Sequence, residues 1–215
     1  MKFTRHFAWS VLLRLFHWAF ALSITALVVT GFYIHFPWTN TMIEGTGAGF
    51  PVAYMRYIHF VAGFVFTAAL LARIYLLFFG NRQERVWDFL PITFRNIKNL
   101  ISTLKYYLYI SRDNEHRIGH NALAGMAYFV TFVAAGFQIV SGFYMLYPES
   151  ASWQPWGVAI FGTQQQARFV HYLLMWYFIL FAFFHLYIVI WNDIQSGEGL
   201  ISSIFNGVKY TPDKA

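Results

Sequence analysis

Four long apolar runs constrain this chain of 215 residues more than any other feature. Each run is long enough to cross the hydrocarbon core of a bilayer, and none shows the alternation of a half-buried strand. Because only helices satisfy their own backbone in lipid without closing into a barrel, the runs predict transmembrane helices. We place these helices at residues 12–36, 54–79, 122–147 and 169–192. The sequence therefore predicts an all-α membrane protein, a four-transmembrane-helix bundle forming a single domain over residues 1–215.

The composition excludes several classes of protein. Hydrophobic residues make up 58% of the chain and charged residues 11%, which is too apolar for a soluble domain. Cysteine is absent, which excludes disulfides, thiolate-bound iron–sulfur clusters and the covalent attachment of c-type haem. The net charge of +6 does not indicate nucleic-acid binding, because the basic residues are distributed by loop.

The basic residues distinguish the two sides of the membrane. Most lie before the first run, between the second and third runs, or at the C-terminus: Lys2, Arg5, Arg14, Arg82, Arg85, Arg95, Lys98, Lys105, Arg112, Arg117, Lys209 and Lys214. The other two connections carry only Arg56 and Arg168, at their ends. Since cytoplasmic loops are enriched in Lys and Arg, we expect both termini and the long middle connection in the cytoplasm.

The middle connection contains an amphipathic segment, residues 93–111. Helical spacing places five apolar residues on one side of it: Phe94, Ile97, Ile101, Leu104 and Leu108. Arg95, Lys98 and Lys105 add positive charge. This pattern predicts a helix lying at the cytoplasmic membrane surface, and the alternative is a mobile loop.

Four of the five histidines in the apolar runs predict the chemistry. His171 and His185 are 14 residues apart, which separates them by roughly 21 Å along one face of a helix. The helix directions place His59 and His171 near the outer side, and His17 and His185 near the cytoplasmic side. Buried polar groups in membrane helices are costly and usually functional. The two depth-matched pairs therefore predict two b-type haems with bis-histidine ligation, an arrangement suited to electron transfer.

A single buried histidine would be interpreted as a packing residue, so the haem prediction depends on the matched set. His35 lies at the membrane edge two residues before Pro37, and we interpret it as an interfacial residue. Four glycines in the runs would let a flat macrocycle approach the backbone: Gly31, Gly63, Gly136 and Gly142. The alternative role of these glycines is ordinary small-residue packing between helices.

Arginine precedes histidine by three residues in a repeated Arg-x-x-His pattern, at Arg14, Arg56 and Arg168. Each arginine lies one helical turn nearer water than its histidine, where a haem propionate would emerge. The alternative is that these arginines flank the helices and extend toward water. Arg56 and Arg168 are more informative, because the outer side otherwise lacks basic residues.

Several stretches make the chain resemble the b-type cytochrome subunits of membrane-bound nickel–iron uptake hydrogenases. The matching stretches are RLFHWAFALSITALVVTGFYI, MRYIHFVAGFVFTAALLARIY with FFGNR, IGHNALAGMAYF, HYLLMWYF with FFHLY, and ISSIFNGVKY. Wider relatives with the same four-helix, di-haem plan are the cytochrome b subunits of formate dehydrogenase and thiosulfate reductase.

The resemblance implies a position in a larger complex at the bacterial inner membrane. The partner would be the hydrogenase small subunit, whose iron–sulfur clusters pass electrons to the outer haem, and through it the large subunit. The chain itself would hold no hydrogen-splitting site. Electrons would cross to the cytoplasmic haem and reduce a quinone within the lipid bilayer.

Three residues are candidates for the quinone. His120 and Asn121, at the start of the third run, could bind a quinone carbonyl or relay protons, although helix capping is the alternative. Arg73 lies 14 residues after His59 and faces inward at the depth of the cytoplasmic haem, where it could serve a propionate or the quinone.

Three other functions remain as alternatives. One is the cytochrome subunit of a formate dehydrogenase or thiosulfate reductase. Another is a haem-free membrane anchor, which would leave the matched histidines unexplained. A transporter with histidine proton relays would be expected to have broken helices or inverted repeats, and we identify no internal repeat.

Overall fold

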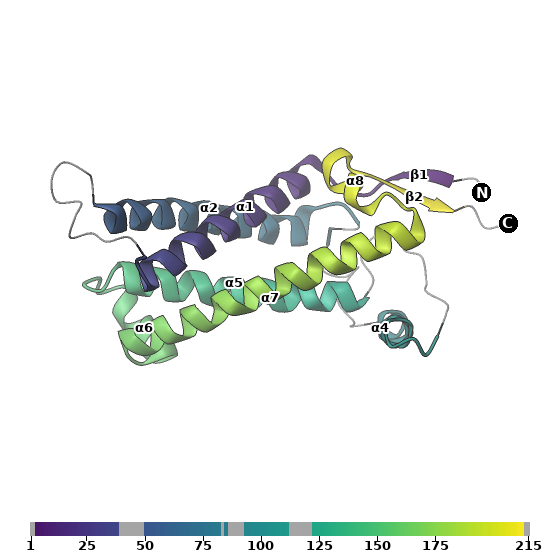
Figure 1. Ribbon diagram of the computed structural model, residues 1–215. Helices are drawn as coiled ribbons and strands as arrows, with labels where there is room; N and C mark the ends of the chain where they lie inside the picture. Colours follow the sequence, from purple (N-terminus) through teal and green to yellow (C-terminus); the bar gives the residue numbers. More distant parts are fainter. Residues whose placement is uncertain (1–2, 39–49, 83, 86–92, 112–121, 213–215) are drawn as a thin grey trace. The chain divides into compact units, whose positions relative to one another are not determined.

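The computed structural model describes residues 3–38, 50–82, 84–85, 93–111 and 122–212 (Figure 1). Four long helices contain the apolar runs: α1 (Val11–His35), α2 (Pro51–Phe79), α5 (Ala122–Leu146) and α7 (Gln164–Ser196). All four are long and apolar enough to cross a membrane. The predicted all-α membrane fold is confirmed. The largest differences from the predicted bounds are in α2, which begins earlier, at Pro51, and in α7, which begins earlier, at Gln164, and ends later, at Ser196.

Large apolar side chains are exposed along the spans, which explains why these helices need a bilayer. Leu22 is 66% exposed, Leu71 61% and Phe183 69%. A soluble protein rarely exposes apolar surface on this scale. In lipid such side chains would contact acyl chains at no cost, as expected of membrane-spanning helices.

Five shorter elements complete the described chain. They are the helices α4 (Phe94–Tyr107), α6 (Trp153–Phe161) and α8 (Leu200–Asn206), and the strands β1 (Phe3–Phe7) and β2 (Val208–Pro212). β1 and β2 pair antiparallel, with Phe7 opposite Val208 (Figure 1). The sequence analysis did not anticipate this pairing, because the two strands lie at opposite ends of the chain and share no hairpin turn.

The chain divides into two compact units, each built from separate segments. Unit 1 comprises Met1–Phe16, Ala72–Ala134 and Phe181–Ala215. Unit 2 comprises His17–Leu71 and Ala135–Leu180. This division leaves the single domain over the whole chain as a prediction.

The core of unit 1 joins the two ends of the chain. Trp9 packs with Leu13 and Leu76, and its indole Nε1 donates a 3.1 Å hydrogen bond to Ser203 Oγ. The backbone N–H of Trp9 donates to the carbonyl of Gly207 at 3.2 Å. Gly207 ends α8 with φ 82°, and a Cβ there would lie 2.7 Å from the Trp9 carbonyl oxygen. Glycine is therefore required at this close approach.

A buried carboxylate connects the start of α1 to the end of α2 within unit 1. Glu84 is 1% exposed. Its Oε1 accepts from the backbone N–H of Ser10 at 2.8 Å, and its Oε2 accepts from the N–H of Asn81 at 3.0 Å. Gly80 leaves room for this carboxylate, since a Cβ there would lie 2.8 Å from Glu84 Oε2. The charged acceptor thus satisfies backbone donors just outside the spans.

α4 packs with its polar side inward. Its buried residues are all polar: Asn96, Asn99 and Thr103. Asn99 Oδ1 accepts a 2.9 Å hydrogen bond from the backbone N–H of Ala122, at the start of α5. Its apolar residues are exposed, including Ile101 at 50%. The predicted helix between the second and third spans is confirmed, and the loop alternative is wrong for Phe94–Tyr107.

Unit 2 has a separate aromatic core at one end. Tyr144 is 1% exposed and packs with Phe161 and Ala167. Its ring lies directly against Gly157 of α6, where an added Cβ would be 2.0 Å from the ring. α6 can therefore cover α5 and α7 only because residue 157 has no side chain.

We expect Glu84→Ala to destabilise the folded protein by about 3 kcal/mol, because two hydrogen bonds to a charged acceptor are lost at about 1.5 kcal/mol each. Thermal unfolding of the detergent-solubilised protein measures this loss. Glu149→Ala is the matched control, because Glu149 is an exposed carboxylate. Equal melting temperatures for the two variants would contradict the role assigned to Glu84.

Candidate haem-binding site

The structure brings His59 of α2 and His171 of α7 together inside unit 2. Their ring centroids are 6.4 Å apart, and the ring planes are inclined by 54°. An imidazole nitrogen binds a first-row transition metal at about 2 Å, so two imidazoles on opposite sides of one metal have ring centres about 6 Å apart. The observed separation fits two axial ligands of one iron. The ligand role of both residues stays a prediction.

Each of these histidines is held by a hydroxyl from a neighbouring helix. Thr30 Oγ1 of α1 lies 2.8 Å from His59 Nδ1, and Ser141 Oγ of α5 lies 2.8 Å from His171 Nδ1. Both hydroxyl residues are buried, at 3% and 0% exposed. Because Nδ1 is engaged on each ring, Nε2 is the nitrogen left to bind a metal. The sequence analysis missed both hydroxyls.

The residue after each hydroxyl is a glycine that lies against the histidine ring. A Cβ on Gly31 would be 3.5 Å from His59 Cε1, and a Cβ on Gly142 would be 3.4 Å from His171 Cε1. Two of the predicted glycines thus lie beside the histidine pair. A Cβ on Gly63 or Gly136 would meet no atom within 4 Å, so there is open space beside both. This donor pair and its small neighbours fit the axial ligation of a b-type haem.

The contacts of the two histidines repeat because the sequence around them repeats. Residues 30–37 read TGFYIHFP and residues 141–148 read SGFYMLYP, and residues 56–60 read RYIHF where residues 168–172 read RFVHY. α1 and α5 both contain 25 residues, and the shared pattern lies at the C-terminal end of each helix. The expectation of no internal repeat is therefore wrong. The repeat was missed because the apolar residues between these positions vary freely.

Equivalent residues of the repeat also contact each other. The His59 and His171 rings form one such pair. Phe66 and Phe178, seven residues further along each helix, form another, with ring centroids 6.0 Å apart. Both phenylalanines are buried. Residues at equivalent positions of the two motifs thus contact each other inside unit 2.

The second predicted pair is distributed over the two units. His185 lies in unit 1, where its Nδ1 is 3.4 Å from the Tyr128 hydroxyl and its ring stacks on Phe181. His17 begins unit 2, and its ring meets the edge of Trp18 with centroids 5.3 Å apart. The pairing of His17 with His185 stays a prediction.

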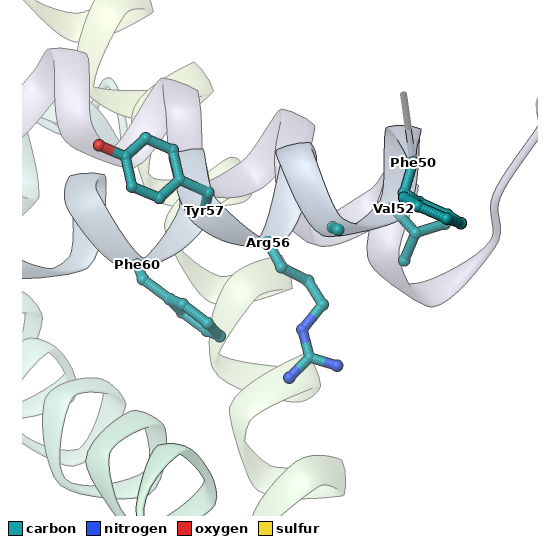
Figure 2. Close-up of a pocket in the computed structure, with 6 residues that line it drawn as sticks. Phe50, Val52, Arg56, Tyr57 and Phe60 are labelled. Carbon is teal, nitrogen blue, oxygen red and sulfur yellow. The ribbon is translucent and has the colours of Figure 1, made fainter. Parts of the chain in front are cut away.

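Arg56 and Arg168, the two arginines predicted for the outer side, are exposed. Arg56 lines an open hollow of about 580 Å³ at the start of α2, with Phe50, Val52, Ala53, Tyr57 and Phe60. Figure 2 shows Arg56 and Phe60 extending from the same side of α2, and Arg56 Cζ lies 5.7 Å from the centre of the Phe60 ring. Arg168 is also exposed, near the start of α7. Both side chains are accessible to an anion such as a propionate.

The other predicted site residues are placed as follows. Arg14 donates through Nη1 to the carbonyl of Phe205 in α8, and Arg73 donates through Nη1 to the carbonyl of Glu84 at 2.9 Å. Their roles toward a propionate or quinone stay predictions. His120 and Asn121 lie outside the described residues.

His35, interpreted above as interfacial, is exposed at the end of α1. Its ring stacks on Tyr172 with centroids 4.7 Å apart. This aromatic contact accounts for its position without a metal.

Comparison with known proteins gives the family of the chain. The profile of the prokaryotic cytochrome b561 family matches residues 8–207. A protein of Cupriavidus necator named "Probable Ni/Fe-hydrogenase B-type cytochrome subunit" is 35% identical, covering 93% of this chain and 85% of its own length. Its namesake from Azotobacter vinelandii is also 35% identical, covering 99% and 91%. The Escherichia coli K12 "Probable Ni/Fe-hydrogenase 1 B-type cytochrome subunit" is 32% identical, covering 95% and 90%.

The four spans, the histidine pair and these similarities lead to one conclusion. The chain belongs to the prokaryotic cytochrome b561 family and is a membrane-bound b-type cytochrome.

Proposed function

We propose that this chain is the electron-transfer and anchoring subunit of a nickel–iron hydrogenase complex in the bacterial inner membrane. It takes electrons from iron–sulfur clusters of the small subunit on the periplasmic side and delivers them to quinone. The observation that carries the proposal is the contact of His59 with His171 inside a bundle of spanning helices. The names of the relatives from Cupriavidus, Azotobacter and Escherichia support the hydrogenase as partner.

The chain's own residues would hold two haems at two depths. His59 and His171 bind the outer iron, and His17 and His185 bind the cytoplasmic iron. When bound, haem supplies a one-electron carrier, and two histidine ligands leave no open position for small molecules. Arg56 and Arg168 neutralise propionates on the outer side. His120, Asn121 and Arg73 are the candidates for the quinone and its protons.

The topology has both termini and α4 in the cytoplasm. α4 supports this arrangement, because its exposed apolar side and buried polar side suit a helix lying in the membrane interface. Lys98 and Lys105 flank the apolar side, where their ammonium groups can reach anionic lipid headgroups.

A formate dehydrogenase or thiosulfate reductase partner is the alternative within the same class. Purification of the intact complex separates the two, since the proposal expects nickel in the partner and the alternative expects molybdenum. Recovery with a molybdenum enzyme would overturn the choice of partner and leave the haem sites unaffected.

Replacing one outer ligand should remove one haem. For His59→Ala and His171→Ala, we expect the pyridine haemochrome assay to fall from two haems per chain to one, because a single imidazole and lipid-side packing hold b-type haem weakly. His35→Ala is the control and should keep both haems. Unchanged haem content in His59→Ala and His171→Ala would contradict the ligand assignment.

The arginine assignment predicts a change in potential. Arg168→Leu removes a positive charge beside a propionate, and we expect the outer haem potential to fall because the reduced, less positive state loses stabilisation. Redox titration followed optically measures the shift. Arg95→Leu, an exposed arginine of α4, should leave the outer potential unchanged. Identical potentials in both variants would remove Arg168 from the site.

The position of α4 can be tested by site-specific labelling, because the chain has no cysteine of its own. A bimane label on Ile101→Cys should be quenched by nitroxide lipids, whereas the same label on Arg5→Cys in the exposed part of β1 should be quenched by aqueous iodide. A label at Ile101 that responds only to iodide would show that α4 does not lie in the interface.

A further inference from the structure

We propose that Thr30 and Ser141 are positioning residues that fix the tautomer of the two outer histidines. Each hydroxyl would hold its histidine with the proton on Nδ1, so that Nε2 carries the lone pair that binds iron. This inference rests on the proposed function, in which His59 and His171 are haem ligands. It assigns to α1 and α5, which contribute no outer ligand, the task of aligning the ligands of α2 and α7.

The direction of the hydrogen bonds follows from where each hydroxyl proton goes. Thr30 Oγ1 donates to the carbonyl of Ala26 on its own helix at 2.6 Å. Ser141 Oγ donates in the same way to the carbonyl of Gln138 at 3.0 Å. A hydroxyl has one proton and two lone pairs. Because the backbone takes the proton, each hydroxyl oxygen must accept from the imidazole at 2.8 Å.

Both imidazoles therefore donate from Nδ1 to a hydroxyl oxygen of a neighbouring helix. A neutral imidazole that donates from Nδ1 has its lone pair on Nε2, which is the tautomer that a metal requires.

The internal repeat makes the two sides of the site equal. The hydroxyl-to-Nδ1 distance is 2.8 Å on both sides. A Cβ added to Gly31 would lie 3.5 Å from the His59 ring, and a Cβ added to Gly142 would lie 3.4 Å from the His171 ring. Each Ser/Thr-Gly pair therefore combines one acceptor with one gap for the ring. The two ligands should donate electron density to the iron equally.

Removing either hydroxyl should raise the outer haem potential. A donated Nδ1–H makes the ligand more basic and favours ferric iron, so its loss favours ferrous iron. For Thr30→Val and for Ser141→Ala we expect the ratio of ferric to ferrous affinity to fall about three- to tenfold. This change corresponds to an upward shift of roughly 30 to 60 mV for a one-electron couple. The double variant should show the sum of the two shifts.

α1 also supplies matched controls. Thr25 Oγ1 donates to the carbonyl of Ala21 at 3.0 Å, and Ser23 Oγ donates to the carbonyl of Phe20 at 2.9 Å. Thr25→Val and Ser23→Ala therefore each remove a hydroxyl that donates to a backbone carbonyl of the same helix, at positions other than the one that contacts His59. Thr30→Ser keeps the acceptor oxygen and should retain the wild-type potential, which separates the hydrogen bond from packing.

The experiment is a redox titration of the purified variants, with low-temperature electron paramagnetic resonance of the ferric outer haem. Raised potentials in Thr30→Val and Ser141→Ala, with wild-type values in Thr30→Ser and both controls, would support the proposal. If Thr30→Val and Ser141→Ala have the potentials of the controls while the outer haem is bis-histidine ligated, this inference is wrong and the proposed function is unaffected. A wild-type protein without a bis-histidine outer haem would instead overturn the proposed function.

Discussion

The structure depends on one requirement of the bilayer interior, that a polar group removed from water must find a partner. An imidazole inside an apolar helix cannot leave Nδ1 unsatisfied without a cost of several kcal/mol on the scale of water-to-hydrocarbon transfer. His59 and His171 meet this requirement through Thr30 and Ser141. The consequence is chemical as well as structural, because satisfying Nδ1 leaves Nε2 on both rings for a metal. The same two hydrogen bonds that satisfy these imidazoles between the helices thus also orient their rings.

A shared sequence pattern explains why the same arrangement surrounds both His59 and His171. These two histidines occupy equivalent positions in RYIHF and RFVHY. Applied further along the chain, the same correspondence matches His17 with Tyr128, and Arg73 with His185. The second pair of predicted ligands therefore comes from non-equivalent positions.

The sequence was sufficient to predict the features that depend on one physical property of a single segment, such as its length or its hydrophobicity. The length of each apolar run fixed the four spans, and helical rise along those spans matched His59 in depth with His171. Other features depend on contacts between distant segments, which periodicity does not record. Glu84 binds Ser10 across 74 residues, and β1 pairs with a strand at the other end of the chain. Thr30 and Ser141 could have been found from the shared Ser/Thr-Gly-Phe-Tyr pattern, because the repeated dipeptide precedes two equivalent Arg-x-x-His motifs.

The central claim is that His59 and His171 bind one iron from opposite sides, and ligand exchange tests it most directly. Near-infrared magnetic circular dichroism of the oxidised His171→Met protein reports the axial ligands of each haem. The account predicts that one haem keeps its bis-histidine band while the other gains the band of histidine–methionine ligation, together with a higher potential. Two unchanged bis-histidine haems in this variant would contradict the account.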